Sequence, residues 1–517
     1  MRWEGIFPLL YFGAFFFFPI SLLVGRFYIQ NLGGTIERFG KLLFFNLFQA
    51  ATSALIATTM GLLMSYVLAR RKIPSIFKIA MGSVEKTSFV IPGISMAIGF
   101  YMMLGKKGFL NLLLSPLGVH LDVLYTFTAV ILGHAFYNAA VTLYILGGAW
   151  ENFDGRLVES AQMDGANDLQ VFFKIELPLL LPALISSFLI SFVYSFTSFA
   201  VVMTIGGPRY STLEVEIYMY ISGLQDFSAA LSLTVLQMIV VAAAALTASF
   251  LIKTHLPYGS PRKTKASVLS YLMLIVPAFF VVTPIILSIT SGFFYKGHPS
   301  LKPFNLLLNR GIYFIGEDLK GIALQTFGIA SVAAVLSTTL GTITAFLSKN
   351  GKKIFYILPI LPSSVSTVTL AFGYFLASKA MNINESVTIP ILHSFLALPM
   401  VHLIMDSGWR KIPREVVEAS MVDGASKKTR FFSIEFPLLL PHLFRSFFLA
   451  FAISMSDLSG VLILSEGKIV TFSRAVFRLL SSRHVMEAKA LNTIFLATVL
   501  AFFLVSESLS ERSQEIS

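Results

Sequence analysis

The sequence contains no cysteine at any of its 517 positions. This absence excludes a disulfide framework, a thiolate metal site and a cysteine nucleophile. The eight histidines are scattered, and neither His-x-x-x-His nor His-Glu-x-x-His occurs, so we expect no catalytic metal site. Charged residues make up only 13% of the chain, which is roughly half the share found in soluble domains. A water-soluble protein of this length would need far more polar surface.

Hydrophobic residues are abundant instead and account for 56% of the chain, with Phe alone at 50 positions. Disorder is excluded, because it requires low hydrophobicity. The class that remains is an all-α polytopic membrane protein, in which each span takes about 20 apolar residues. Prolines inside the apolar runs, such as Pro92 and Pro359, predict kinks. We expect twelve spans, at 6–24, 42–68, 84–104, 125–149, 181–202, 229–251, 268–289, 322–347, 354–377, 387–405, 440–464 and 490–505.

The first apolar run could be a signal peptide, since Arg2 precedes it. However, the run is longer than a typical signal core, and no small-x-small cleavage site follows it. We therefore interpret it as a retained first span.

Basic residues are concentrated in alternate connections between the spans. These connections fall on one side if both termini are cytoplasmic, although Arg26, Arg38 and Lys41 fall on the other side. The formal net charge of +12 thus indicates basic cytoplasmic loops rather than nucleic-acid binding. The basic residues concerned are Arg70, Arg71, Lys72, Lys78, Lys253, Arg262, Lys263, Lys265, Lys349, Lys352 and Lys353.

The two halves of the chain resemble each other. The segment 159–182 aligns without a gap with 418–441, at an offset of 259 residues, and His134 and His393 keep that offset. Because each copy follows the fourth span of its half, the halves are parallel repeats, related by a pseudo-twofold axis along the membrane normal. We therefore expect a first six-span domain at 1–255, a cytoplasmic linker at 256–267 and a second six-span domain at 268–517.

The repeated segment has the pattern of a short helix, a turn and a second helix. Gly165 and Gly424 provide residues that adopt positive φ at a helix end. Asn167 and Ser426 can cap the next helix, and Gln170 stands where a capping-box partner belongs. A plain amphipathic interfacial segment is the alternative. Two equivalent surfaces, however, suggest a partner that is itself a twofold dimer.

The pattern Glu-[Ala/Ser]-[Ala/Ser]-x-x-Asp-Gly-Ala, followed by the Pro-Leu-Leu-Leu-Pro stretch, resembles the signature loop of type I ABC importer membrane subunits. It departs from the usual Glu-Ala-Ala only at Ser160 and at the Ala-Ser pair 419–420. The resemblance implies that each loop is a coupling helix seated in a cytoplasmic ATPase subunit. The implied coupling residues are Glu159, Ala161, Asp164, Gly165, Ala166, Glu418, Ser420, Asp423, Gly424 and Ala425.

Two such loops in one chain resemble the fused permeases of thiamine and ferric-iron importers. Segments 134–138, 198–208, 211–218 and 454–460 are more similar to the thiamine permeases, so we expect thiamine or its phosphates as the substrate, with ferric iron as the alternative. The resemblance implies a bacterial inner-membrane location and two partners besides the bilayer. These are a homodimeric cytoplasmic ATPase and an extracytoplasmic substrate-binding protein.

A nucleotide-binding Gly-x-x-x-x-Gly-Lys-[Ser/Thr] loop is missing from the sequence. We therefore expect the ATPase on a separate chain, and we expect this chain to be neither an enzyme nor a holder of a cofactor. A nucleotide-independent secondary transporter would need paired charges inside the spans. A membrane-embedded enzyme would need a convergent His, Asp or Glu cluster, and the sequence offers neither pattern.

Asp457 is the clearest ionisable residue within a span, where such groups usually face a cavity or a partner. Its equivalent in the first half is Ser198. Both are candidates for lining or gating the pathway, and a hydrogen bond from Asp457 to Ser454 or Ser456 is the alternative. We expect His134 and His393 to join helices.

The segment 206–227 follows the fifth span on the outer side. Its Gly-Gly-Pro start predicts a turn, and its later residues predict a surface helix that carries Glu214 and Glu216. The equivalent segment 466–482 is more basic and includes Arg474. These unlike surfaces could dock an asymmetric binding protein, or they could anchor the chain at the membrane interface.

Overall fold

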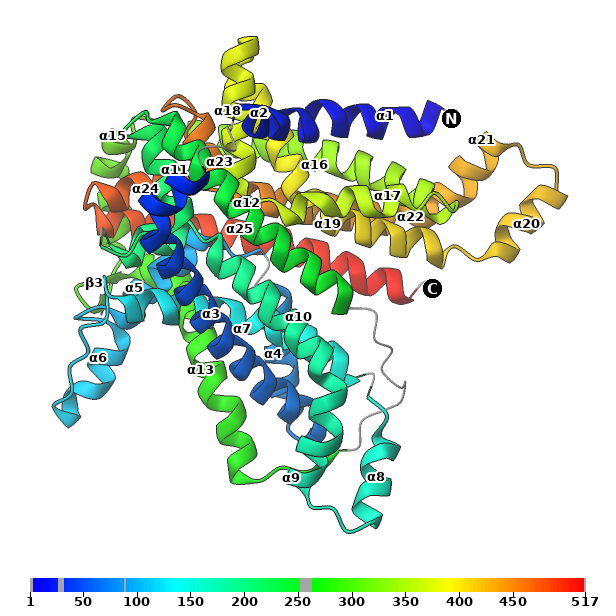
Figure 1. Ribbon diagram of the computed structural model, residues 1–517, viewed down its shortest axis with the longest axis horizontal. Coiled ribbons are helices and arrows are strands. Elements are labelled where there is room, and N and C mark those ends of the chain that lie inside the picture. Colours follow the sequence, from blue (N-terminus) through cyan, green and yellow to red (C-terminus); the bar gives the residue numbers. More distant parts are fainter. Residues whose placement is uncertain are drawn as a thin grey trace. The chain divides into compact units, whose positions relative to one another are not determined.

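The computed structural model describes residues 3–26, 32–87, 90–151, 153–207, 209–251 and 263–515 (Figure 1). Within these ranges the chain is almost entirely helical, which confirms the all-α class. Its strands are two pairs of two-residue segments, β1 (Arg71–Lys72) with β2 (Thr264–Lys265) and β3 (Phe294–Tyr295) with β4 (His298–Pro299).

Ten helices among the described residues are long and apolar enough to cross a membrane, and an eleventh span results if one bent helix pair counts as a span. The chain is thus a multi-pass membrane protein. The ten helices are Gly5–Gly25, Ile36–Arg70, Phe127–Trp150, Asp168–Phe196, Phe227–Ala244, Val268–Phe293, Leu319–Lys349, Glu385–Lys411, Lys427–Ser456 and Val485–Leu509.

The third and ninth expected spans account for the lower number, because neither forms one straight helix. The third is divided between α4 (Ser75–Thr87) and α5 (Gly93–Leu104), and Pro92 directly precedes α5. The ninth bends by 96° before α18 (Thr367–Met381), after a 3-10 turn, η8 (Leu358–Ser364), that contains two prolines. Proline lacks an amide donor and clashes with the preceding turn, so the predicted kinks occur at these prolines.

Residues Gln30–Ser291 form one compact unit. Its centre is the packing of α3 on α7, with α10 against both. Gly61 of α3 permits close approach, since a Cβ at this position would lie 2.0 Å from Thr142 Oγ1 of α7. The helices of this unit not yet given are α3 (Leu32–Arg70), α6 (Phe109–Leu114), α7 (Phe127–Glu151), α8 (Gly155–Met163), α9 (Asp168–Val171), α10 (Leu177–Phe196), α11 (Leu213–Ser222), α12 (Phe227–Leu251) and α13 (Val268–Thr290).

The second compact unit comprises Met1–Ile29 and Gly292–Ser517. Here α16 packs on α19, and α22 packs on α16, α19 and α25. Gly341 takes the place of Gly61, since a Cβ on it would lie 2.5 Å from Val401 Cγ1 of α19. The helices of this unit not yet given are α1 (Trp3–Phe12), α2 (Phe18–Arg26), α14 (Lys302–Leu306), α15 (Ile312–Ile315), α16 (Leu319–Lys349), α17 (Ile354–Ile357), α19 (Glu385–Lys411), α20 (Arg414–Val422), α21 (Lys427–Arg430), α22 (Phe436–Ser456), α23 (Ser459–Leu464), α24 (Phe472–Ser481) and α25 (Val485–Glu515).

The repeat is visible in the elements themselves. The helices α8, α9, α10 and α11 begin 259 residues before α20, α21, α22 and α24, respectively. The compact units nevertheless do not coincide with the two halves of the sequence. Helix α13, from the second half, belongs with the first repeat, and helices α1 and α2, from the first half, belong with the second repeat. The division at 1–255, 256–267 and 268–517 follows the repeat along the chain, and most of its linker lies outside the described residues.

The fifth span of each half begins and ends earlier along the chain than the sequence predicted, since the observed helices run from Asp168 to Phe196 and from Lys427 to Ser456. The expected helix 181–202 ends at Phe196, and the expected helix 440–464 is interrupted after Ser456 and resumes as α23. Ser198 and Asp457 therefore lie at helix breaks and not inside continuous helices. In each unit the repeated loop lies at one end of the long helices, and the short helix α11 or α24 lies at the opposite end (Figure 1).

Candidate functional site

The first repeated loop contains a hydrogen-bonded turn directly after α8. Gly165 has φ +86°, so the predicted positive φ is confirmed. Its N–H donates to the Gln162 carbonyl at 3.1 Å, and the Ala166 N–H donates to the Ala161 carbonyl at 2.9 Å. This pair of bonds satisfies the last carbonyls of a helix, and it requires a left-handed residue that glycine supplies at little cost.

The second loop contains the same turn after α20. Gly424 has φ +78°. Its N–H donates to the Met421 carbonyl at 3.1 Å, and the Ala425 N–H donates to the Ser420 carbonyl at 2.9 Å. Both bonds join atoms 259 residues after their equivalents in the first loop, so the repeated motif encodes one backbone structure twice.

The start of α8 is fixed by a local ion pair. Asp154 is the N-cap, and its carboxylate accepts from the Arg156 amide at 3.0 Å. The Arg156 guanidinium also donates to this carboxylate, at 2.7 Å from Nη2 to Oδ2. These hydrogen bonds from Arg156 lower the pKa of Asp154 below its usual range, which keeps the cap charged at neutral pH. The equivalent position before α20 is Pro413, which offers no side-chain cap.

Three small residues of the motif face inward, whereas Ser160 and Ala419 are exposed. In the first loop, Ala161 and Ala166 pack against a buried cluster that includes Trp150, Phe153 and Val158. In the second loop, Ser420 is buried, and its Oγ donates to the Val417 carbonyl at 2.6 Å. A large side chain at these three positions would separate the loop from the helices beneath it.

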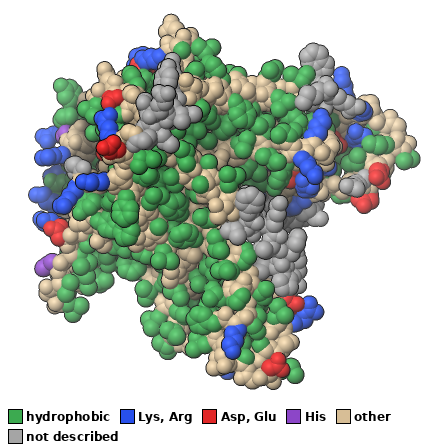
Figure 2. All heavy atoms as spheres, in the orientation of Figure 1, with side chains coloured by type: hydrophobic (Ala, Val, Ile, Leu, Met, Phe, Trp, Pro, Cys, Tyr) green, Lys and Arg blue, Asp and Glu red, His purple; other side chains and the backbone are tan. Residues whose placement is uncertain are grey.

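The charged residues of the motif face the surface together with large apolar side chains. Met163 is 89% exposed and Val422 is 87% exposed, although both are hydrophobic. Acidic, basic and hydrophobic side chains lie together at the ends of both loops (Figure 2). Exposed apolar side chains beside charges are typical of a protein interaction surface. The exposed residues are Glu159, Met163, Asp164 and Leu169 in the first loop and Glu418, Met421, Val422 and Asp423 in the second.

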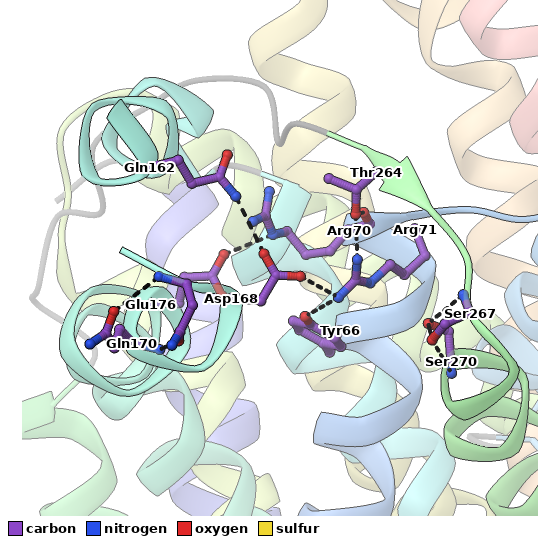
Figure 3. A network of polar contacts seen from close by, with 11 residues as sticks. Tyr66, Arg70, Arg71, Gln162, Asp168, Gln170, Glu176, Thr264, Ser267 and Ser270 are labelled. Carbon is purple, nitrogen blue, oxygen red and sulfur yellow. Dashed lines mark hydrogen bonds and ion pairs between the residues drawn. The ribbon is translucent and has the colours of Figure 1, made fainter. Parts of the chain in front are cut away.

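A polar network joins the base of the first loop to the end of α3 (Figure 3). Arg70 Nε lies 2.8 Å from Glu176 Oε1, and the two side chains are only 6% and 1% exposed. Arg71 Nη2 lies 3.0 Å from Asp168 Oδ2. The predicted capping box of α9 is present as well, since Asn167 accepts from the Gln170 amide at 2.9 Å.

The base of the second loop has a different arrangement. Ser426 caps α21 by accepting from the Thr429 amide at 3.1 Å, as predicted. Glu435, the equivalent of Glu176, lies 3.6 Å from the nearby Arg430. Lys427 occupies the position of Asp168. The two loops thus share a turn but differ in the charges that hold their bases.

Asp457 caps the helix that follows the break in the second half. Its Oδ2 accepts from the amides of Gly460 at 2.9 Å and Val461 at 3.3 Å, and it lies 3.2 Å from His393 Nε2. The other nitrogen of His393, Nδ1, lies 2.8 Å from Ser454 Oγ. The carboxylate therefore holds a helix break and contacts a second span. The described contacts of the Asp457 side chain do not include Ser454 or Ser456.

At the break in the first half, side chains of another helix, α3, hold the backbone carbonyls that precede the break. Asn46 and Gln49 donate to the carbonyls of Phe196 and Ser195, at 3.1 and 3.0 Å. His134 Nδ1 lies 2.9 Å from Gln49 Oε1, so this histidine joins α7 to α3. At Ser198 the backbone carbonyl accepts from Thr212 at 3.1 Å. Among the described residues, no three His, Asp or Glu side chains lie close enough together to hold a metal ion.

The predicted short helices at the outer side are present as α11 and α24, but their charged residues differ from expectation. Glu214 is buried, and Gln237 Nε2 donates to its carboxylate at 2.5 Å. Glu214 therefore does not form a docking surface in this structure, whereas Glu216 is half-buried. Arg474 is also half-buried, and its guanidinium donates to Ser465 Oγ at 2.9 Å and to the Ile469 carbonyl.

The sequence does not indicate the side chains that hold the loop bases or the first helix break, whereas Asp457 at the second break is a predicted site residue. The sequence indicates Arg71 only as one of several positive charges. Asn46 and Gln49 are far in the sequence from the carbonyls to which they donate. Glu176 could have been predicted as a functional residue from the sequence, because a glutamate recurs at the equivalent position 435 inside the repeated segment.

The chain matches one protein-family model in two regions, residues 57–259 and 337–511. The model describes the binding-protein-dependent transport system inner membrane component. The two regions begin four residues before Gly61 and four residues before Gly341, the equivalent glycines of the two central helix pairs.

Similar proteins include permeases of two transport systems. A ferric transport system permease protein of Actinobacillus pleuropneumoniae is 26% identical over 72% of this chain and 58% of its own length. A thiamine transport system permease protein of Escherichia coli is 27% identical over 38% of this chain and 36% of its own length. One from Haemophilus influenzae is 22% identical over 86% of this chain and 84% of its own length. The chain thus spans less than two thirds of the first two relatives.

Proposed function

We propose that this chain, which belongs to the family of binding-protein-dependent transport system inner membrane components, is a fused permease subunit. Such a subunit carries both halves of an alternating-access pathway. Its class is that of an ABC importer permease, which is not itself catalytic. The observation that carries the proposal is the turn found twice, with the same two hydrogen bonds, at positions 259 residues apart.

The two loops are the proposed coupling sites for a homodimeric ATPase on a separate chain. Each loop presents two carboxylates and large apolar side chains to the surface. Each ends its presenting helix in a turn that is closed by two backbone hydrogen bonds. A twofold partner would meet one such surface with each subunit. Closure of the ATPase dimer on ATP would then act on both halves through these loops.

The proposed orientation places both termini and both loops in the cytoplasm of a bacterial inner membrane. The basic connections that follow the second and eighth spans lie on the side of the loops under this orientation. The helices α11 and α24 then face outward, where they are the proposed contacts of a substrate-binding protein. Glu216 and Arg474 stay candidates for that contact, and Glu214 contributes only to the internal packing of α11 on α12.

The proposed substrate is thiamine or one of its phosphates. Support comes from the thiamine permease of Haemophilus influenzae, which aligns over 86% of this chain. A ferric ion is the second candidate, because the ferric permease of Actinobacillus pleuropneumoniae has the higher identity, 26% against 22%. Ser198 and Asp457, at the two helix breaks, remain the proposed pathway or gate positions.

Two measurements test these proposals. Vesicles that contain the chain, a candidate ATPase and its binding protein are expected to take up substrate only when ATP is supplied. Uptake that persists without the ATPase would instead indicate a nucleotide-independent transporter. Binding of thiamine, thiamine phosphates and ferric iron to the isolated binding protein then separates the substrate candidates, since only the true substrate is expected to bind tightly.

A further inference from the structure

We propose that Arg71 is a positioning residue that joins the first coupling loop to the segment linking the two halves. Through this residue, movement of the loop would pass directly to the start of α13. The inference rests on the proposed function of the loop. Three elements far apart in the sequence meet at this one side chain, which is only 15% exposed (Figure 3).

The guanidinium of Arg71 makes three polar contacts at once. Its Nη2 donates to Tyr66 Oη of α3 at 2.8 Å and to Asp168 Oδ2 of α9 at 3.0 Å. Its Nη1 donates to Thr264 Oγ1 of β2 at 2.5 Å. A planar, permanently charged fork of donors is suited to holding several acceptors in fixed directions, whereas a lysine ammonium is not.

The backbone strengthens the contact with the linking segment. Arg71 and Lys72 form β1, which pairs in parallel with Thr264 and Lys265 of β2. Two residues later, Ser267 caps α13 by accepting from the Ser270 amide at 3.3 Å. The connection therefore runs from the loop through Arg71 and β2 into the first turn of α13.

The neighbouring ion pair fixes the other side of the loop. Arg70 and Glu176 are both buried and lie 2.8 Å apart. Since Arg70 is the last residue of α3 and Arg71 follows it directly, the loop is attached at Glu176 and at Asp168 to the end of this helix. The loop base and this helix end are thus expected to move as one body.

The second loop lacks the chemistry for an equivalent junction. Lys427 replaces Asp168, so the acceptor becomes a positive charge. Its glutamate, Glu435, is paired within the loop region by Arg430 and not by the end of a span. The first loop is therefore tied to a span and to the linking segment, while the second loop is held locally.

The test uses the full chain in lipid nanodiscs with its ATPase and binding protein. Arg71→Ala removes all three contacts, and Arg71→Lys keeps the charge but not the fork. Thr264→Val removes the bonds of the threonine hydroxyl to Arg71 and to the Arg70 carbonyl. Lys72→Ala is the matched control, because Lys72 is the exposed neighbour in the same strand. The readouts are hydrogen exchange at residues 263–270 and the ratio of substrate transported to ATP hydrolysed.

Arg71→Ala is expected to speed exchange at residues 263–270 by about tenfold, because a hydrogen bond to a charged group is lost. The transport ratio is expected to fall while ATPase binding is kept. Arg71→Lys should be intermediate. Thr264→Val should add less in the Arg71→Ala background than in the wild type, because only its bond to the Arg70 carbonyl is then left to lose. Unchanged exchange, an equal effect of Lys72→Ala or full additivity with Thr264→Val would overturn the proposal. If the wild-type chain binds no ATPase, the proposed function fails, while the exchange measurement still decides the junction.

Discussion

Single residues of the repeated loop are constrained by backbone conformation rather than by space. At Gly165 and Gly424, no heavy atom lies within 4 Å of where a Cβ would be, yet both residues are left-handed. In this conformation, most other residues are roughly 1–2 kcal/mol less stable, and Asn is less affected because it adopts this region more readily.

We therefore predict that Gly165→Val and Gly424→Val weaken the turn, while Gly165→Asn is largely tolerated. Each valine variant should reduce ATP-driven uptake, because the carboxylates of the preceding helix lose their fixed position. Uptake in vesicles and protease sensitivity of the loop provide the measurement. Wild-type values for both valine variants would contradict the structural role of the turn.

Asp457 allows a structural role and a transport role to be separated. Asp457→Ala leaves the amides of Gly460 and Val461 without their acceptor and should lower the free energy of unfolding by about 1–3 kcal/mol. Asp457→Asn keeps an acceptor for these amides, removes the charge and replaces the oxygen that accepts from Ser459 Oγ by an amide nitrogen. We predict near-wild-type thermal stability for the asparagine variant and reduced uptake if a cationic substrate passes this carboxylate. Normal uptake in that variant would limit Asp457 to capping α23.

At the scale of the helix, the repeated glycines set how closely the central spans pack. Gly61 faces Thr142 and the backbone of Leu143, whereas Gly341 faces Val401 mainly through a side-chain methyl group. A methyl group added at Gly61 therefore meets backbone that cannot yield. At Gly341 it meets a side chain that has more freedom to rotate.

This difference predicts an ordered series of stabilities. Gly61→Ala should destabilise the protein by about 1–3 kcal/mol through overpacking, and Gly341→Ala should cost less. Gly40→Ala in α3 and Gly328→Ala in α16 are matched controls, since nothing lies within 4 Å of their Cβ positions. They should be neutral or stabilising by up to about 1 kcal/mol. Thermal unfolding in nanodiscs measures the series, and a stable Gly61→Ala variant would refute the packing argument.

At the scale of the whole molecule, the sequence predicted what depends on local patterns. The glycine turns and the caps at Asn167 and Ser426 follow from neighbouring residues, and the structure confirms them, together with ten of the twelve spans. The ion pair of Arg70 with Glu176 joins positions far apart in the chain, so no local pattern could show it. The breaks after Phe196 and Ser456 escaped prediction because apolar residues continue beyond them, while polar side chains from other spans support the freed backbone groups. The exchange of α1 and α13 between the compact units also depends on packing alone.

The presence of two loops in one chain leads to a prediction about binding strength. A dimeric ATPase that engages both loops binds bivalently, so loss of one loop should weaken binding by about a hundredfold or more. We predict this loss for Glu159→Lys and for Glu418→Lys separately, and no measurable binding for the double variant.

Both carboxylates are exposed, so the free energy of unfolding should change by less than about 0.5 kcal/mol. Glu37→Lys is the matched control, because it reverses an exposed carboxylate outside both loops. Equilibrium binding of the labelled ATPase to the chain in nanodiscs measures the effect. Because the first loop is also tied to α3 through Arg71, its single variant should lose more transport per ATP than the second. Equal binding by the single variants and the wild type would show that the ATPase does not use these carboxylates.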